Sequence, residues 1–207
     1  VRNIMAVKHF DWTQYQADIR PEKVAIIDLD TGRSLTYQSL DNRASALAAG
    51  FQAKGIAKGD RVALLMPNCP EFFEIQFACA KVGAICLPLN WRLTEAELEY
   101  ILNDSTPSVL IFDGSFGTTA SSLLSLCNIK HGLELSQDNA TSPYEVLLAG
   151  AGELKPVECT HDDVSMIMYT SGTTGHPKGA LITFGMTFYN CVNLGIPSAI
   201  STKSVQL

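Results

Sequence analysis

Long apolar runs are missing from this sequence of 207 residues. Nowhere do 18 apolar residues follow one another, so no membrane span is predicted, and the stretch through Lys8, Asp11 and Asp18 lacks the apolar core of a signal peptide. Charge is also scarce, because only 17% of residues are charged and the net charge is −6. This balance disfavours non-specific attraction to nucleic acid or to an anionic membrane surface, while a hydrophobic content of 46% allows a sizeable core.

Metal-binding cysteine patterns are absent too. The sequence has no CxxC pair, and its few histidines do not cluster at the spacing of metal ligands, so a structural zinc site is not expected. Most of the cysteines stand among apolar residues, as is typical of reduced, buried thiols in a cytoplasmic protein. The cysteines are Cys69, Cys79, Cys86, Cys127, Cys159 and Cys191.

The first part of the chain predicts a β-hairpin followed by a helix. Residues 24–29 and 34–37 have the composition of two strands, and residues 30–33 that of the turn between them. From Leu40 to Phe51, apolar residues recur at the spacing of one helical face. Gly55 can end this helix in a left-handed conformation.

Strand and helix signals then alternate. The apolar runs 61–66, 84–89 and 109–112 predict buried strands. Pro70 can occupy the first position of a helix, and the T-x-x-E pattern that begins at Thr94 predicts a capping box at the start of another. This alternation predicts an α/β fold with a mostly parallel sheet flanked by helices.

Residues 114–152 carry weaker signals. Ser, Thr and Gly clusters separate only a leucine-rich segment at 123–126 and a short strand near Leu133. A clear signal returns at residues 164–169, whose apolar run predicts a buried strand that leads directly into a segment rich in serine, threonine and glycine. No internal repeat is visible.

Residues 170–178 have the composition of a phosphate-binding loop. Glycines let backbone amides approach phosphate oxygens, hydroxyl groups donate hydrogen bonds, and Lys178 after the rigid Pro177 can neutralise negative charge. The Walker A pattern does not fit, since it requires the order Gly-Lys-Ser/Thr. A Ser/Thr/Gly linker without a binding role is the alternative, but such linkers seldom follow a buried strand directly. The candidate nucleotide-binding residues are Thr170, Ser171, Gly172, Thr173, Thr174, Gly175 and Lys178.

The run YTSGTTGHPKG, from Tyr169 to Gly179, closely resembles the signature loop of the adenylate-forming (AMP-binding) superfamily, which includes acyl-CoA synthetases, adenylation domains and luciferases. Residues 35–40 and 81–89 contain two weaker features that resemble the family in the same order. The resemblance implies that residues 1–207 are an incomplete N-terminal AMP-binding domain of a fatty-acid or acyl-CoA synthetase, without the C-terminal part and lid domain. Such a chain is expected not to turn over substrate alone.

What the family implies is ATP-dependent activation of a carboxylic acid to an acyl-adenylate with release of pyrophosphate, followed by capture with the thiol of CoA and release of AMP. By this resemblance the loop would hold the β- and γ-phosphates, and Lys178 would stabilise the departing pyrophosphate. Thr170 or a neighbouring hydroxyl would approach Mg²⁺. ATP, Mg²⁺ and CoA are thus the expected cofactor and co-substrates. One departure is Phe184, which follows Thr183 where many relatives carry histidine.

The nature of the acid is less well specified. Residues 88–93 resemble acyl-CoA synthetases for fatty or aryl acids and favour a fatty acid. Trp91 and Arg92 equally fit a plain anchor of a strand-to-helix turn, through stacking and a salt bridge. Adenylation of an aryl or amino acid and a non-catalytic nucleotide-binding or interaction fragment are the alternatives. The sequence specifies neither the length of the acyl chain nor the oligomeric state.

Overall fold

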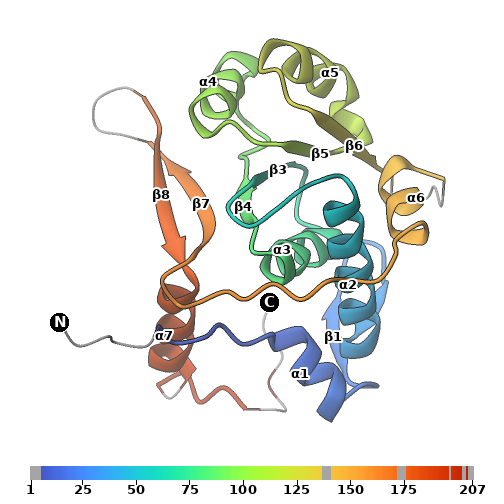
Figure 1. Cartoon of the computed structure of the whole chain (residues 1–207), viewed down its shortest axis with the longest axis vertical. Helices are drawn as coiled ribbons and strands as arrows, with labels where there is room; N and C mark the ends of the chain where they lie inside the picture. Colours follow the sequence, from blue (N-terminus) through green and yellow to red (C-terminus); the bar gives the residue numbers. More distant parts are fainter. Residues whose placement is uncertain (1–5, 137–140, 172–175, 196, 202–203, 205–207) are drawn as a thin grey trace.

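The computed structural model describes residues 6–136, 141–171, 176–195, 197–201 and 204. Its helices and strands alternate along much of the chain (Figure 1). The strands are β1 Val24–Ile27, β2 Ser34–Thr36, β3 Arg61–Leu65, β4 Ile85–Pro88, β5 Val109–Asp113, β6 His131–Leu135, β7 Val164–Thr170 and β8 Lys178–Thr183. The helices are α1 Trp12–Ile19, α2 Tyr37–Ala53, α3 Pro70–Val82, α4 Glu95–Ser105, α5 Gly117–Leu126, α6 Pro143–Ala149 and α7 Phe184–Gly195, with a 3-10 turn at Gly114–Phe116.

The main sheet, within the described part of the chain, has the strand order β6-β5-β3-β4-β7-β8. Neighbouring strands from β6 to β7 are parallel, and only β8 runs antiparallel to its neighbour β7. β1 and β2 form a separate antiparallel hairpin, as the sequence predicts. The expected α/β class with a mostly parallel sheet is therefore confirmed.

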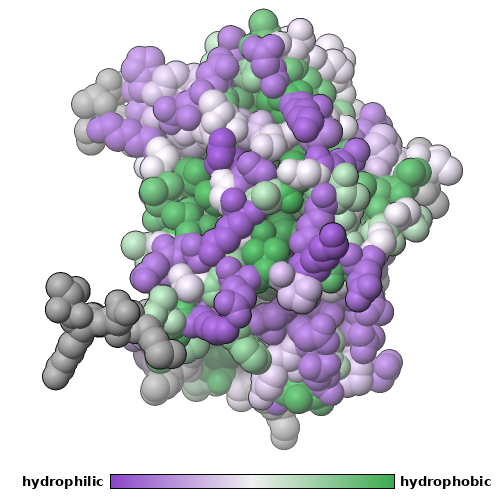
Figure 2. Space-filling model, in the orientation of Figure 1, coloured by the Kyte–Doolittle hydropathy of each residue, from purple (hydrophilic) through white to green (hydrophobic). Residues whose placement is uncertain are grey.

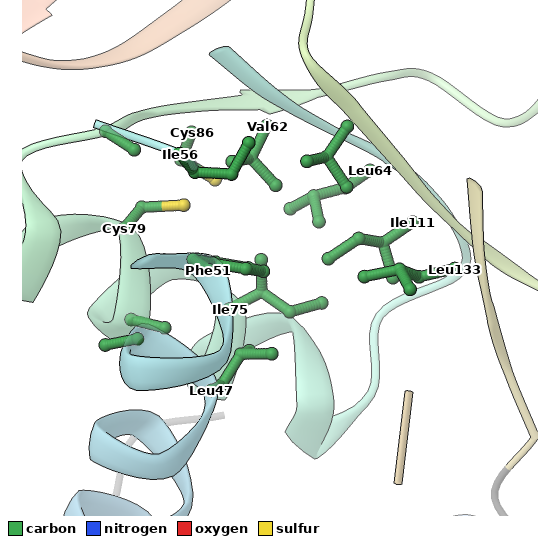
Figure 3. Packing of buried hydrophobic residues seen from close by; sticks show 14 of the residues in the cluster. Leu47, Phe51, Ile56, Val62, Leu64, Ile75, Cys79, Cys86, Ile111 and Leu133 are labelled. Atoms are coloured by element: carbon green, nitrogen blue, oxygen red, sulfur yellow. The ribbon is translucent and has the colours of Figure 1, made fainter. Parts of the chain in front are cut away.

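Two hydrophobic layers enclose this sheet because neighbouring strand residues point to opposite faces. On β3, Val62 and Leu64 pack against α2, α3 and α6, whereas Ala63 and Leu65 pack against α4 and α5. Figure 3 shows Leu64 in the first layer, with side chains from α2 and α3 turned towards the strands. Burial on both faces explains why the central strands appear in the sequence as short, continuous apolar runs.

Helix ends follow local chemistry that the sequence makes visible. At the start of α4, the Thr94 side chain accepts a hydrogen bond from the Glu97 amide, and the Glu97 carboxylate accepts one from the Thr94 amide, so the predicted capping box is confirmed. Pro70 begins α3 and Gly83 ends it in a left-handed conformation with φ of 71°. Gly55 has φ of 80° just after α2, as expected.

Two glutamates in the first part of α3 are buried in ion pairs. Arg33 donates to both carboxylate oxygens of Glu71, at 2.8 and 3.1 Å. Arg43 of α2 contacts Glu74 at 2.6 Å, and the Tyr144 hydroxyl of α6 donates to the same carboxylate at 2.8 Å. These contacts tie α2, α3, α6 and the β1–β2 hairpin together.

The prediction that residues 164–169 form a strand is confirmed, but the prediction that this strand is buried is wrong. Within β7 only Ile167 is buried, and Met168 is 47% exposed. β7 and β8 lie at one end of the described sheet, and of their residues only Ile167 is buried in the layer formed with α4 and α5, so the outer residues of both strands reach solvent. Figure 2 shows hydrophobic surface over these two strands, at the left of the view.

The burial of the cysteines agrees only in part with expectation. Cys79, Cys86 and Cys159 are buried, whereas Cys191 on α7 is exposed and the other two are intermediate. All of these thiols are free. Apolar neighbours therefore predict the burial of Cys86 in β4 and of Cys79 in α3, whereas Cys159 is buried although Glu158 and Thr160 flank it.

Candidate functional site

The segment that resembles a phosphate-binding loop connects two paired strands. In the antiparallel register of β7 and β8, Thr170 lies opposite Lys178 and Tyr169 lies opposite Gly179. Lys178 is thus the first residue of β8 rather than a loop residue, because backbone pairing continues to the end of the hairpin stem. Four of the candidate binding residues, Gly172, Thr173, Thr174 and Gly175, lie outside the described residues.

The described polar residues of this segment face solvent. Thr170, Ser171 and Lys178 are all exposed. None of the ion pairs among the described residues includes Lys178. The hairpin stem therefore presents a hydroxyl group and an ammonium group from adjacent strands, and both can reach an anion in solvent.

Gly179 has a packing role beside Lys178. A Cβ at this position would lie 2.9 Å from Cγ2 of Ile167 and 3.2 Å from Cζ of Tyr169. Both neighbours belong to β7, so only glycine lets the strands approach this closely without rearrangement. The last glycine of the signature thus shapes the stem, while the lysine before it remains exposed.

Both arms of the hairpin contact α4. The Tyr169 hydroxyl donates a hydrogen bond to Oδ2 of Asp104. The His176 ring stacks on the Tyr100 ring with a centroid separation of 4.9 Å and an interplanar angle of 25°. Burial, together with the hydrogen bond to Asp104, raises the pKa of Tyr169. Sequence reasoning missed both α4 residues.

A cleft opens between α4 and the hairpin stem. Tyr100 and Glu97 line it from the helix, and Thr170, Ser171 and His176 line it from the stem. Two of the predicted binding residues therefore share one cleft, and Lys178 lies directly across the strand pair from Thr170.

Comparison with known proteins assigns this arrangement to a family. A family model described as AMP-binding enzyme matches residues 13–205. The chain belongs to the AMP-binding enzyme family. The family assignment of the signature is confirmed, and the hairpin stem just described holds the described residues of that signature.

Curated relatives and solved structures agree with this assignment. The chain is 37% identical over 193 residues to feruloyl-CoA synthase of Amycolatopsis sp, covering 92% of this chain and 36% of that protein. It is 38% identical over 178 residues to a long-chain-fatty-acid–CoA ligase of Mycobacterium tuberculosis, covering 86% of this chain and 35% of the ligase. The chain thus spans about a third of the length of these relatives.

Among solved structures, the AMP complex of O-succinylbenzoate coenzyme A synthetase from Bacillus subtilis has a TM-score of 0.80 at 27% identity, over 94% of this chain and 48% of that one. The inhibitor-bound N-terminal domain of FACL13 from Mycobacterium tuberculosis has a TM-score of 0.77 at 34% identity, over 86% of this chain and 45% of that one. These likenesses support the fold of an N-terminal domain.

Phe184, the departure from the family pattern, lies at the other end of β8 from the signature segment. It is buried, and its ring stacks on that of His9 with a centroid separation of 3.9 Å. Both rings line a cavity of about 360 Å³ that Lys81 and Asp11 also border. Burial lowers the pKa of His9. Phe184 is therefore a packing residue in this chain that also borders a cavity.

Trp91 and Arg92 anchor a turn by stacking. The Arg92 guanidinium carbon lies 4.3 Å from the Trp91 ring centroid. The described residues hold no ion pair to Arg92, so the contact is stacking without the salt bridge that was considered. This geometry fits the interpretation of Trp91 and Arg92 as an anchor of the turn that follows β4.

Among the described residues, no group of three or more His, Cys, Asp or Glu side chains is placed to hold a metal ion. The role of Thr170 towards magnesium therefore stays a prediction. In the same part of the chain, no helix is long and apolar enough to cross a membrane.

Proposed function

We propose that this chain supplies the phosphate-binding part of an ATP-dependent acid–thiol ligase. In the reaction, a carboxylate oxygen attacks the α-phosphorus of ATP and pyrophosphate leaves. The thiol of CoA then attacks the acyl carbonyl, and AMP leaves with the carboxylate oxygen. The observation that carries the proposal is the exposed pair Thr170 and Lys178, opposite each other where the signature hairpin begins and ends.

Each proposed role follows from charge. Pyrophosphate departs with more negative charge than it carries in bound ATP, so a fixed cation and hydrogen-bond donors aimed at it lower the barrier. We assign the cation to Lys178 and donors to Thr170 and Ser171, together with the backbone and hydroxyl groups of residues 172–175. Mg²⁺ near Thr170, and a cytoplasmic location, belong to the same proposal.

The proposed acid is a fatty acid, with an aryl acid as the second candidate. The relatives include a long-chain-fatty-acid–CoA ligase and a feruloyl-CoA synthase, whose names indicate a fatty and an aryl acid respectively. A pyrophosphate-release screen of the complete enzyme with fatty, aryl and amino acids separates these readings. Activity with amino acids alone would reject both candidates.

We also propose that residues 1–207 form only the N-terminal part of the AMP-binding domain, with the C-terminal part and lid domain supplied elsewhere in the complete enzyme. The chain spans about a third of its curated relatives. A phosphate-binding segment alone, without groups that hold the α-phosphate and the carboxylate, gives little help to the transition state. We therefore expect no pyrophosphate release by this chain, and robust release would contradict this division.

Calorimetric titration of the chain with Mg·ATP tests the site directly. A charge-assisted contact contributes about 1.5–3 kcal/mol, so Lys178→Ala should weaken binding about 10- to 100-fold. Lys130→Ala is the matched control, because Lys130 is exposed and precedes β6 at the opposite edge of the sheet. Equal affinities of the wild-type chain and Lys178→Ala would remove Lys178 from the site. An absence of binding to the wild-type chain would mean that the site does not form in this chain alone.

A further inference from the structure

We propose that Tyr100 and Asp104 of α4 are positioning residues for the hairpin that β7 and β8 form: from one face of the helix, they hold both arms of the stem. The consequence for nucleotide binding rests on the function proposed above. The positioning itself can be tested without nucleotide.

The two contacts reach the hairpin from a single helix face. Tyr100 and Asp104 are four residues apart, so they lie one above the other on α4. Asp104 accepts the hydrogen bond of Tyr169 on the incoming strand, and Tyr100 stacks on His176 just before the returning strand begins. Each arm of the hairpin therefore has its own contact, and the two contacts lie on opposite sides of the segment 172–175.

The sheet itself gives the end of this stem little support. The recorded pairing of β7 with its inner neighbour β4 is at Met166, opposite Cys86. Tyr169 and Thr170 lie beyond that pair, and their strand partners among the described residues are on β8. Since β8 is at the edge of the sheet that the described residues form, contacts with α4 supply lateral support that the ladder does not.

α4 is well suited to act as a fixed platform. Its first turn is closed by the capping box described above, and the residues Leu98, Ile101 and Leu102 on its inner face are buried against the sheet. Moving the helix would expose this apolar surface to water, which is costly. Because the helix is fixed in this way, its outer residues Tyr100 and Asp104 also have a fixed position relative to the core.

Tyr169 remains a donor in this arrangement. Burial and the neighbouring Asp104 carboxylate both raise the pKa of Tyr169, so its hydroxyl stays protonated across the neutral range. The contact between Tyr100 and His176 is a stacking of two rings, so it depends on the shape of the rings rather than on a hydrogen bond. The two contacts therefore differ in chemistry, and separate substitutions can remove each of them.

A stem held in place before nucleotide arrives has less conformational freedom to lose on binding, which improves affinity without any new contact to the ligand. Loss of either α4 contact should weaken Mg·ATP binding about 3- to 30-fold, which is about 0.7–2 kcal/mol at about 1.4 kcal/mol per tenfold change. Neither α4 residue needs to touch the nucleotide for this effect.

The first measurement is the NMR signal of the His176 ring in the 207-residue chain without nucleotide. Stacking on Tyr100 should shift this signal through the ring current of the tyrosine, and the shift should persist in Tyr100→Phe and disappear in Tyr100→Leu. Asp104→Ala should reduce it because the other arm is released, whereas Asn103→Ala should leave it unchanged. Asn103 is the matched control, since it is an exposed neighbour of Asp104 on the same helix. The chain has four histidines, so His176→Gln identifies the signal.

A double-mutant cycle tests the second contact. Tyr169→Phe and Asp104→Ala remove the same hydrogen bond, so the double variant should shift the His176 signal no further than either single variant does. The same variants are then titrated with Mg·ATP, and Tyr100→Phe should restore most of the affinity that Tyr100→Leu loses. An unchanged His176 signal in both Tyr100→Leu and Asp104→Ala would overturn the proposal, and so would variants that lose the contacts yet keep wild-type affinity. If the wild-type chain fails to bind Mg·ATP, the direct test of the proposed function has failed, and the histidine spectra still decide the positioning.

Discussion

Replacing Arg43 with alanine should destabilise the chain by an amount that depends strongly on pH. The Glu74 side chain is 1% exposed, and its carboxylate contacts Arg43 at 2.6 Å and the Tyr144 hydroxyl at 2.8 Å. In Arg43→Ala, this carboxylate keeps one hydrogen bond but loses its positive partner. Breaking a buried ion pair in this way costs about 3–5 kcal/mol, and we expect about 3 because the Arg43 side chain is 30% exposed and water can enter.

Protonation of Glu74 limits that cost. Burial already raises the pKa of Glu74 above its ordinary value of 4.5, although Arg43 opposes this, so removal of Arg43 should raise it further. Because the pKa of Glu74 is higher in the folded than in the unfolded state, protonation of Glu74 favours folding. This contribution is fully present below the pKa of the unfolded state and is lost as the pH rises through the pKa of the folded state. Protonating a glutamate costs about 1.4 kcal/mol per pH unit above its unfolded pKa. The destabilisation should therefore be about 1 kcal/mol at pH 5 and about 3 kcal/mol at pH 8.

Urea unfolding followed by circular dichroism at pH 5 and pH 8 measures both values. The control is the double variant Arg43→Ala/Glu74→Gln, in which a neutral amide replaces the unpaired carboxylate and can still accept from Tyr144. At pH 8 this double variant should be more stable than Arg43→Ala alone. A loss in Arg43→Ala that is the same at both pH values, or a double variant that is no more stable than the single one, would refute the reasoning that an unpaired buried charge causes the loss.

Three further predictions concern local structure. Thr94→Ala removes the side-chain cap of α4 and should cost about 1 kcal/mol in urea unfolding, whereas Thr94→Ser should cost much less. Gly83→Ala should cost more than about 1 kcal/mol in the same assay, because φ is 71° and the new Cβ would lie 2.9 Å from Sγ of Cys159. In the native chain, a thiol reagent should label the exposed Cys191 first and leave Cys79 unlabelled until urea unfolds the protein, since burial raises the pKa of Cys79 and blocks access. Prompt labelling of Cys79 would contradict the described packing of α3.

The central part of the fold was predictable because its signals are local. β3 and β5 are buried on both faces, so each produces a short apolar run, and the capping box of α4 depends only on two side chains three positions apart. By contrast, α1 buries Thr13 and Ala17, whereas its larger apolar residues Tyr15 and Ile19 are exposed, so its apolar spacing does not mark its buried face. Thr13 is held by a hydrogen bond to Asp41, a contact between distant residues that no periodicity reveals.

The outer part of the sheet was predicted less well for the opposite reason. α7 has a hydrophobic composition, yet it buries only Phe184 and Gly185. The apolar residues of α7 therefore do not predict which of its side chains are buried in this chain. The start of β8 was missed because its first two residues, Lys178 and Gly179, belong to the signature, whose serine, threonine and glycine content was interpreted as loop up to Lys178. Strand pairing across the hairpin overrode that local composition.

The structure divides the signature into residues that shape the hairpin and residues available for chemistry. Tyr169 and Gly179 lie opposite each other on the stem, and their neighbours constrain both residues. The Tyr169 hydroxyl donates a hydrogen bond to Asp104, and a residue larger than glycine at position 179 would press against Tyr169 and Ile167. The next pair, Thr170 and Lys178, is exposed on the same strands. The amino-acid composition of the signature is enough to identify the exposed pair, since hydroxyl and ammonium groups are typical of phosphate-binding sites. The roles of the first and last residues of the motif, Tyr169 and Gly179, become clear only from their contacts with α4 and β7. A hairpin that kept Thr170 and Lys178 but lost these contacts would hold the hydroxyl and ammonium groups in the wrong place.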